Sequence, residues 1–302
     1  MENQEINLTL KTGLYSFIIM AFLFSGCASS ADKLKASAEE PHAIYLKYPI
    51  VLVHGIARND REKTVHPWGR IPETLREYNV QFYYGDTDAW GTIESNAELL
   101  KTTIDKILAK TKNEKVNIIA HSKGGIDSRY CIWKYQYGDR VASLTTISTP
   151  HHGSEIADLL YNSPIIHTAT TRRRLKIIGE MFGDVHPDIY TLNYELTTWN
   201  MTKFNEDITL DKRVYYQSIY STMAKASDDL LLSSTHNYIK KMSGNNDGLV
   251  SEKSAIWGNQ TTKIPGSLSH EQIIGHNKNI NNGIDVPAIY LEIITELSEL
   301  GF

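Results

Sequence analysis

The sequence predicts an α/β domain with a mostly parallel central sheet and helices on both of its faces. Two observations lead to this fold class. Short apolar runs that suit buried strands alternate along the chain with longer segments whose apolar residues recur at helical spacing. The chain has 302 residues, 41% of them hydrophobic, which is enough to bury a core of this kind.

Five segments are predicted to be strands because each is a short apolar run next to turn residues. The first ends in His54-Gly55, and the third leads directly into a glycine-rich turn. A parallel sheet is buried on both faces, so its strands are expected to be apolar throughout rather than alternating. The predicted strands are 48–55, 80–86, 115–120, 141–149 and 213–221.

Four segments between and after these strands are predicted to be helices. In 93–110, Leu100, Ile104 and Ile107 fall on one helical face. Gly138 ends a second helix, and Pro287 lies near the start of the last one, where proline is tolerated. The predicted helices are 71–78, 93–110, 125–138 and 286–300.

Residues 153–210 interrupt the alternation. They contain several short, partly apolar helical patches and no clear strand. The simplest explanation is a helical insertion between two strands of the core. The whole domain is expected to span residues 44–302.

The N-terminus differs from the rest of the chain. Lys11 precedes the apolar stretch "GLYSFIIMAFLFSGC", which suits a signal peptide over residues 1–26. The small residues before Cys27 resemble the lipobox of bacterial lipoproteins, which implies acylation of Cys27 and a tether over 27–43. We therefore expect an exported, membrane-anchored lipoprotein, at the outer membrane or cell surface. The alternative is an incidental cysteine in a secreted or periplasmic protein.

Charge and cysteine content limit the partners. The net charge of −4, without a long single-sign block, favours no nucleic-acid partner. The chain has two cysteines, so acylation of Cys27 would leave Cys131 without an internal disulfide partner. The sequence does not indicate an oligomeric state.

Ser122 is the first candidate for chemistry. It lies in "VNIIAHSKGGID", where a predicted strand meets a predicted helix. A sharp turn of this kind exposes a serine above the sheet and needs small residues at its flanks, here Ala120, Gly124 and Gly125. The N-terminus of the following helix favours negative charge at this point. The pattern therefore predicts a nucleophilic serine.

A serine nucleophile that transfers acyl groups also needs two amide donors for the oxyanion. The residue after it, Lys123, would supply one backbone N–H. The loop after the first strand, in "VLVHGIARND", would supply the other from Ile56.

The serine further needs a base and a carboxylate that orients it. Asp247 lies in the turn-rich "GNNDGLVS" after the last predicted strand and is the candidate acid. His270 and His276 both follow it. We favour His270, which lies on a serine- and glycine-rich loop before the last helix, and keep His276 as the alternative. The histidines before Asp247 are expected to shape loops.

These stretches together resemble the bacterial triacylglycerol lipases of the secreted true-lipase group, which have the α/β-hydrolase fold. The resemblance rests on "YPIVLVHGI", "KVNIIAHSKGG", "STPHHGS", "NDGLVS" and "SHEQ", which occur in the right order over most of residues 48–275. It implies Ser122 as nucleophile, Asp247 as acid, His270 as base, and the segment after "STPHHGS" as the lid.

The chain also departs from that family. The resemblance implies a calcium site with an aspartate two residues after the histidine, but this position is Gln272. An amide oxygen can bind Ca²⁺ without the charge of a carboxylate. Asp228 and Asp229 would be only half of a site. We therefore expect no required cofactor or metal and leave calcium binding open.

The sequence thus predicts a serine carboxylic-ester hydrolase, of the lipase or esterase type, that acts on an ester or lipid substrate through an acyl-enzyme. An acyltransferase, a phospholipase or a thioesterase could use the same triad. A third possibility is a surface lipoprotein that binds lipid without catalysis.

Overall fold

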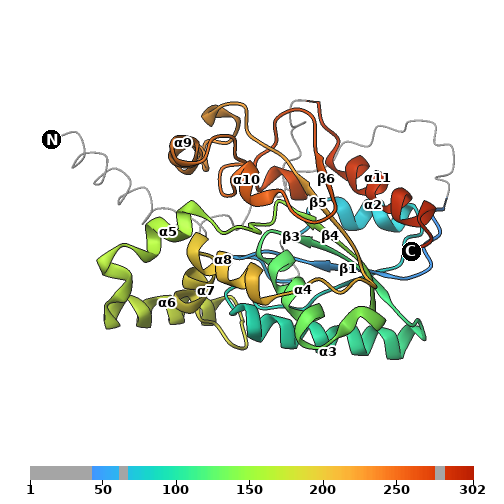
Figure 1. Ribbon diagram of the computed structural model, residues 1–302. Helices are drawn as coiled ribbons and strands as arrows, with labels where there is room; N and C mark the ends of the chain where they lie inside the picture. Colours follow the sequence, from blue (N-terminus) through green and yellow to red (C-terminus); the bar gives the residue numbers. More distant parts are fainter. Residues whose placement is uncertain (1–42, 61–66, 276–282) are drawn as a thin grey trace.

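The computed structural model describes residues 43–60, 67–275 and 283–302 (Figure 1). Its centre is a six-stranded sheet in which every pair of neighbouring strands is parallel. The strand order is β2-β1-β3-β4-β5-β6. The strands are β1 (Ile50–Val53), β2 (Phe82–Tyr84), β3 (Val116–His121), β4 (Val141–Ile147), β5 (Tyr215–Tyr220) and β6 (Gln260–Lys263). The predicted fold class is confirmed.

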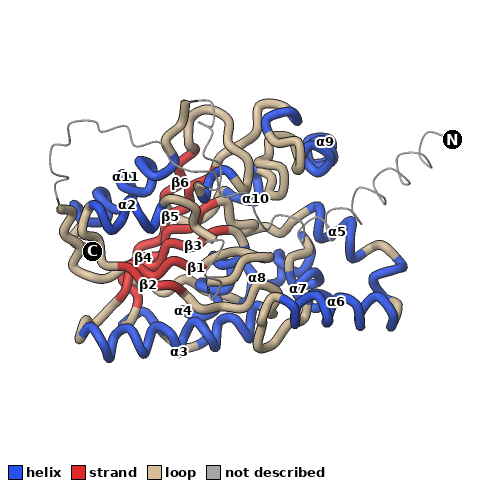
Figure 2. Tube along the Cα trace, turned by 180° about the vertical axis from the view of Figure 1, so that it is seen from behind, coloured by secondary structure: helices blue, strands red, loops and turns tan. Residues whose placement is uncertain are grey.

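Helices cover both faces of this sheet, as Figures 1 and 2 show. Side chains along β1 alternate between the faces, because successive residues of a strand point in opposite directions. Ile50 and Leu52 pack with α2 (Ile71–Glu77) and α11 (Val286–Glu299). Val51 and Val53 pack on the other face, where α3 (Ile93–Thr111) and α4 (Lys123–Lys134) contribute apolar side chains. The two-sided burial explains why the strands are apolar throughout.

The segments that the sequence did not predict are short or polar. Strand β6 has the sequence QTTK, and all four of its residues are exposed at the edge of the sheet. It pairs with β5 through backbone hydrogen bonds and so needs no apolar pattern. The other unpredicted elements are α9 (Ser233–Met242), α10 (Glu252–Ala255), η3 (Ala226–Asp228) and η4 (Gln272–Ile274). The helix predicted to end at Gly138 ends at Lys134, and the short helix η1 (Tyr137–Asp139) follows it.

The segment between β4 and β5 is helical. It contains α5 (Glu155–Tyr161), η2 (Pro164–His167), α6 (Ala169–Met181), α7 (Ile189–Glu195) and α8 (Thr198–Asp207). Helices α5, α6 and α7 lie beside one another at one end of the sheet (Figure 1). We refer to residues 153–210 as the insertion.

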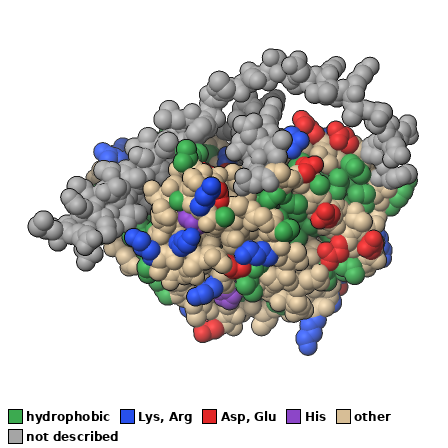
Figure 3. Space-filling model, turned by 90° about the horizontal axis from the view of Figure 1, so that it is seen from above, with side chains coloured by type: hydrophobic (Ala, Val, Ile, Leu, Met, Phe, Trp, Pro, Cys, Tyr) green, Lys and Arg blue, Asp and Glu red, His purple; other side chains and the backbone are tan. Residues whose placement is uncertain are grey.

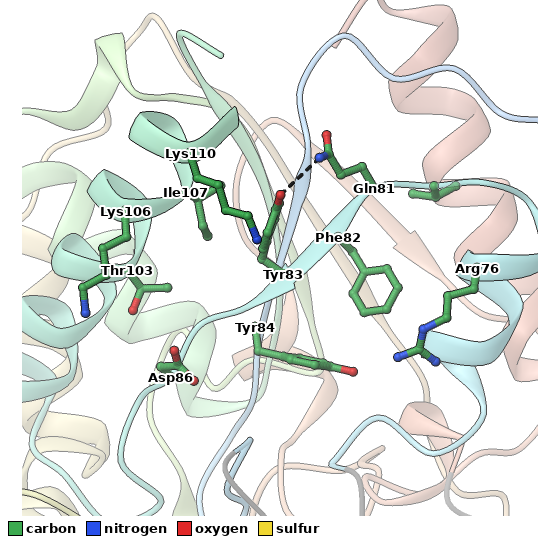
Figure 4. A pocket seen from close by; sticks show the side chains of 11 residues that line it. Arg76, Gln81, Phe82, Tyr83, Tyr84, Asp86, Thr103, Lys106, Ile107 and Lys110 are labelled. Carbon is green, nitrogen blue, oxygen red and sulfur yellow. Dashed lines mark hydrogen bonds between the residues drawn. The ribbon is translucent and has the colours of Figure 1, made fainter. Parts of the chain in front are cut away.

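A groove of about 660 Å³ runs along the outer edge of the sheet at β2 (Figure 4). Arg76 from α2 and Lys106 and Lys110 from α3 border it, and the aromatic side chains of β2 form its floor. None of the candidate catalytic residues lines this groove. We therefore assign it no part in the chemistry.

The face seen in Figure 3 carries acidic and basic side chains interspersed with uncharged ones. No field of one sign covers it, in keeping with the small net charge of −4. An extended basic surface of the kind that binds nucleic-acid backbones is therefore not seen on this face.

We expect Leu52→Ala to lower the free energy of unfolding by about 2–5 kcal/mol, because Leu52 is fully buried between the sheet and α2–α11. Thr262→Ala in the exposed strand β6 is the control and should change it by less than about 0.5 kcal/mol. Urea unfolding followed by circular dichroism measures both. Equal effects would contradict the assignment of the core.

Candidate active site

Ser122 lies at the turn between β3 and α4 in a conformation that L-residues rarely adopt, with φ 54° and ψ −131°. Hydrogen bonds hold it there. Its N–H donates to Ile147 O at 2.9 Å, and its carbonyl accepts from Thr149 Oγ1 at 2.8 Å and from Gly125 N at 3.1 Å. The next strand therefore fixes the strained turn from both sides of the serine.

Three glycines let the backbone approach Ser122 closely. A Cβ on Gly124 would lie 2.4 Å from His54 O, and one on Gly125 would lie 2.3 Å from Thr149 Oγ1. These contacts give the steric reason for small residues after the serine. A Cβ on Gly55 would lie 2.7 Å from Ser122 Cβ, so the loop after β1 packs directly against the serine.

The structure brings Ser122, Asp247 and His270 together at hydrogen-bond distance. Ser122 Oγ lies 2.9 Å from His270 Nε2, and His270 Nδ1 lies 2.8 Å from Asp247 Oδ2. All three side chains are buried. With the imidazole proton on Nδ1, His270 donates to the carboxylate and accepts from the serine hydroxyl. This arrangement can remove the hydroxyl proton as the oxygen attacks.

The turn that carries Asp247 fixes its carboxylate. Asp247 Oδ1 accepts from the N–H groups of Leu249 at 3.0 Å and Val250 at 2.8 Å, which leaves Oδ2 for His270. The backbone of His270 also donates to Asp247 O at 2.9 Å. Acid and base are therefore joined by two separate hydrogen bonds, one between side chains and one between backbones.

The pKa of His270 is raised above its ordinary value. Burial alone disfavours the imidazolium and lowers the pKa, but the charge of Asp247 and its hydrogen bond outweigh that effect. The imidazole is thus a stronger base than a histidine in water, as removal of a hydroxyl proton requires.

The two predicted oxyanion donors lie on either side of the serine. Lys123 is the first residue of α4, so its amide has no carbonyl partner within the helix. Ile56 follows Gly55, the residue that packs on Ser122. Within the described part of the chain, neither amide hydrogen-bonds to another protein group. Both donors are therefore available to a developing negative charge.

The Lys123 side chain takes no part in this arrangement. Its Nζ lies 2.6 Å and 2.9 Å from the two carboxylate oxygens of Asp127, one helical turn further on, in a buried ion pair. Asn96 Nδ2 also donates to Asp127, at 2.9 Å. The hydrogen bond from Asn96 therefore joins the start of α4 to α3.

Carboxylates fasten the insertion to the loop that follows β2, a feature that the sequence analysis did not predict. Asp88 accepts from the N–H groups of Val185 and His186 at 2.7–3.0 Å. In return, Asp184 accepts from the N–H groups of residues 89 and 90 at 2.9 and 2.7 Å. No sequence motif signals such contacts, because the donors are backbone groups.

A third carboxylate makes a similar contact. Glu195 Oε2 in α7 accepts from Ile93 N, at the start of α3, at 2.8 Å. Burial raises the pKa of Glu195 to about 7. The loop that carries Ile56 also contacts the segment after β2, because Ala57 N donates to Ala89 O at 3.2 Å. The insertion and the loop with Ile56 are therefore attached to one common segment.

Of the histidines expected to shape loops, His54 and His121 contact backbone carbonyls of loop residues, whereas His151 contacts Thr146 within β4. His121 Nε2 lies 3.1 Å from His270 O, and His54 Nδ1 lies 2.7 Å from Gly55 O. His151 Nε2 lies 2.9 Å from Thr146 Oγ1. His276, the alternative base, lies outside the described residues.

The side chains around Gln272 do not fit the calcium site that the family resemblance implies. Gln272 Nε2 donates to Asp228 O at 3.1 Å, so an N–H faces the carbonyl where a cation would need another oxygen. Gln272 Oε1 is occupied by Ser269 N at 2.9 Å. Among the described residues, no group of three or more His, Cys, Asp or Glu could hold a metal ion.

Comparison with known proteins supports the fold. A family model described as a PGAP1-like alpha/beta domain matches residues 46–170. A crystal structure of the Bacillus licheniformis lipase BlEst2 in mature form aligns with a TM-score of 0.62. The alignment covers 85% of this chain and 96% of that chain, at 22% identity.

The chain has the α/β-hydrolase fold. Among curated relatives, a triacylglycerol lipase of Vibrio cholerae is 31% identical over 198 residues, 63% of this chain and 62% of the relative. A triacylglycerol lipase of Pseudarthrobacter phenanthrenivorans is 36% identical over 118 residues, 38% of this chain and 36% of the relative. The matches thus span less than two thirds of these relatives.

The predicted signal peptide, Cys27 and the tether up to residue 42 lie outside the described residues. Within the described part, no helix has the length and hydropathy needed to cross a bilayer. The acylation of Cys27 stays a prediction.

We expect kcat/KM for an uncharged ester to fall as the pH is lowered and His270 becomes protonated. The apparent pKa of this fall should lie above about 6.5, the ordinary histidine value. The direction follows from the raised pKa of His270, because only the neutral imidazole can accept the serine proton. A pH–rate profile with a nitrophenyl ester measures it. An acid limb centred well below pH 6 would contradict the assignment.

Asp247→Asn should lower ester hydrolysis by about 10⁴-fold near neutral pH, because the amide can favour the wrong imidazole tautomer and carries no charge. The acid limb of any residual activity should move to lower pH, since the charge that raises the His270 pKa is gone. Glu252→Gln, at a carboxylate that contacts Tyr220, is the control and should keep both rate and profile.

Proposed function

We propose that the chain is a serine carboxylic-ester hydrolase, of the lipase or esterase type, that works through an acyl-enzyme. One observation carries the proposal: the hydrogen-bonded series Ser122–His270–Asp247 lies next to the backbone amides of Ile56 and Lys123, which have no hydrogen-bond partner among the described residues. An ordinary buried serine would need neither the strained turn nor these amides. Together they provide a nucleophile, a base and an oxyanion site.

In the first half of the reaction, His270 Nε2 takes the hydroxyl proton while Ser122 Oγ attacks the acyl carbonyl. The resulting oxyanion accepts hydrogen bonds from the N–H groups of Ile56 and Lys123. Asp247 stabilises the imidazolium. His270 then donates the proton to the alkoxide oxygen as the C–O bond breaks, and the alcohol leaves.

In the second half, water replaces the alcohol. His270 removes a proton from the water, whose oxygen attacks the acyl-enzyme carbonyl, and the oxyanion forms again at the same amides. When this intermediate collapses, Ser122 recovers its proton from His270 and the carboxylic acid is released. The same groups therefore serve both half-reactions.

The substrate class that we propose is an acyl ester of lipid type. The triacylglycerol lipases among the relatives support it. The insertion also presents large apolar side chains to solvent, with Ile177 47%, Met181 67% and Val185 55% exposed. Exposed apolar side chains of this size suit contact with acyl chains.

We further propose that acylated Cys27 holds the enzyme at a membrane, as the lipobox-like sequence suggests. The catalytic domain would then work close to its lipid substrate. Mass spectrometry of the protein from membranes would test this. An unmodified Cys27, or a protein cleaved elsewhere, would favour the secreted or periplasmic alternative.

Ser122→Ala should lower hydrolysis of nitrophenyl esters by more than about 1000-fold, because it removes the nucleophile. The control is Ser234→Ala, at an exposed position in α9, which should keep the wild-type rate. A Ser122→Ala protein with full activity would end the proposal. Product analysis with an added alcohol separates hydrolysis from acyl transfer.

A further inference from the structure

The segment that carries His270 is fixed by hydrogen bonds on both sides of the histidine. Ser269 Oγ donates to Asp229 Oδ2 at 2.7 Å, and Ser267 Oγ donates to Asp228 Oδ2 at 2.5 Å. Both aspartates belong to the segment around η3, 40 residues earlier in the case of Asp229. The base of the triad therefore depends on a contact between two loops.

Gln272 completes this contact. It lies two residues after His270 and is almost fully buried, at 9% exposed. Its Oε1 accepts from Ser269 N, and its Nε2 donates to Asp228 O. The orientation of the amide follows from its partners, because the reverse would set N–H against N–H and oxygen against oxygen. One side chain thus joins the residue before the histidine to the second loop.

We propose that Gln272 is a positioning residue whose amide replaces a bridging metal ion, so that the loop of His270 is held to Asp228 and Asp229 by hydrogen bonds alone. The inference rests on the proposed function, since it concerns the base of that reaction. A cation would require oxygen ligands on every side, whereas this site has a donor facing Asp228 O. A divalent cation is therefore not needed for activity.

The loss of rate expected on removal of the Gln272 amide follows from the distance between His270 and Ser122. His270 Nε2 must stay within hydrogen-bond reach of Ser122 Oγ, and a displacement of about 1 Å can cost about 100-fold in rate. Loss of the Gln272 amide would also leave Ser269 N without its partner in a buried place. Both effects act on the base and not on substrate binding.

The test compares the wild type with Gln272→Met, Gln272→Glu and the control Gln136→Glu, which makes the same charge change at an exposed glutamine. For each protein we would measure the rate of Ser122 labelling by a fluorophosphonate, kcat and KM for a nitrophenyl ester, and the thermal midpoint. Every measurement is made with a chelator and with millimolar Ca²⁺.

The wild type and Gln136→Glu should give the same rates in chelator and in Ca²⁺. Gln272→Met, which has similar length but no polar group, should lose about 10- to 100-fold in kcat and in labelling rate, with KM little changed. In chelator, Gln272→Glu should show the same loss in kcat and labelling rate as Gln272→Met. In Ca²⁺ it should recover part of both rates, because its carboxylate would supply the missing charged ligand.

A folded Gln272→Met protein that reacts at the wild-type rate would overturn the positioning role. Inactivation of the wild type by chelator would overturn the claim that no metal is needed. If Ca²⁺ does not change the rates of Gln272→Glu, the claim that the Gln272 amide takes the place of a metal ion is overturned. Failure of the fluorophosphonate to label wild-type Ser122 would instead count against the proposed function.

Discussion

The close approach of the loop after β1 to the turn at Ser122 is the constraint on which the site depends. Gly55 and Gly124 leave no room for a side chain between these two backbones. The approach places the serine and the amide of Ile56 in one small region and leaves the start of α4 open beside them. Hydrogen bonds from the ends of β4 keep the turn in its strained form. The position of Ser122 is thus set by backbone packing rather than by its own side chain.

Much of the fold and the main candidate residues could be predicted from the sequence because their signals are local. The apolar runs of β1, β3 and β4 and the helical spacing of α3 are visible in short windows. Ser122 has its glycines beside it, and Asp247 has its turn residues. Strand β6 could not be predicted, because its residues are polar and exposed and so lack the apolar run that marks a buried strand.

The features of the site that could not be predicted from the sequence are contacts between segments far apart along the chain. Asp88 and Asp184 bind backbone amides almost 100 residues away, and any sequence can supply an amide. Gln272 was noted only as a departure from the family pattern, and its two partners could not be read from the chain. Choosing His270 over His276 from sequence rested on loop composition alone, whereas its distances to Ser122 and Asp247 are properties of the folded chain.

The insertion and the loop after β2 are joined by hydrogen bonds between carboxylates and backbone amides. The strength of this attachment therefore does not depend on the side chains of the residues that supply the amides. Val185 and His186 bind Asp88 through their backbone N–H groups. Their side chains can therefore be substituted without loss of these hydrogen bonds. Residues 185 and 186 could therefore be replaced in a combinatorial library while the attachment of the insertion is kept. The two aspartates, by contrast, should be kept constant in such a library.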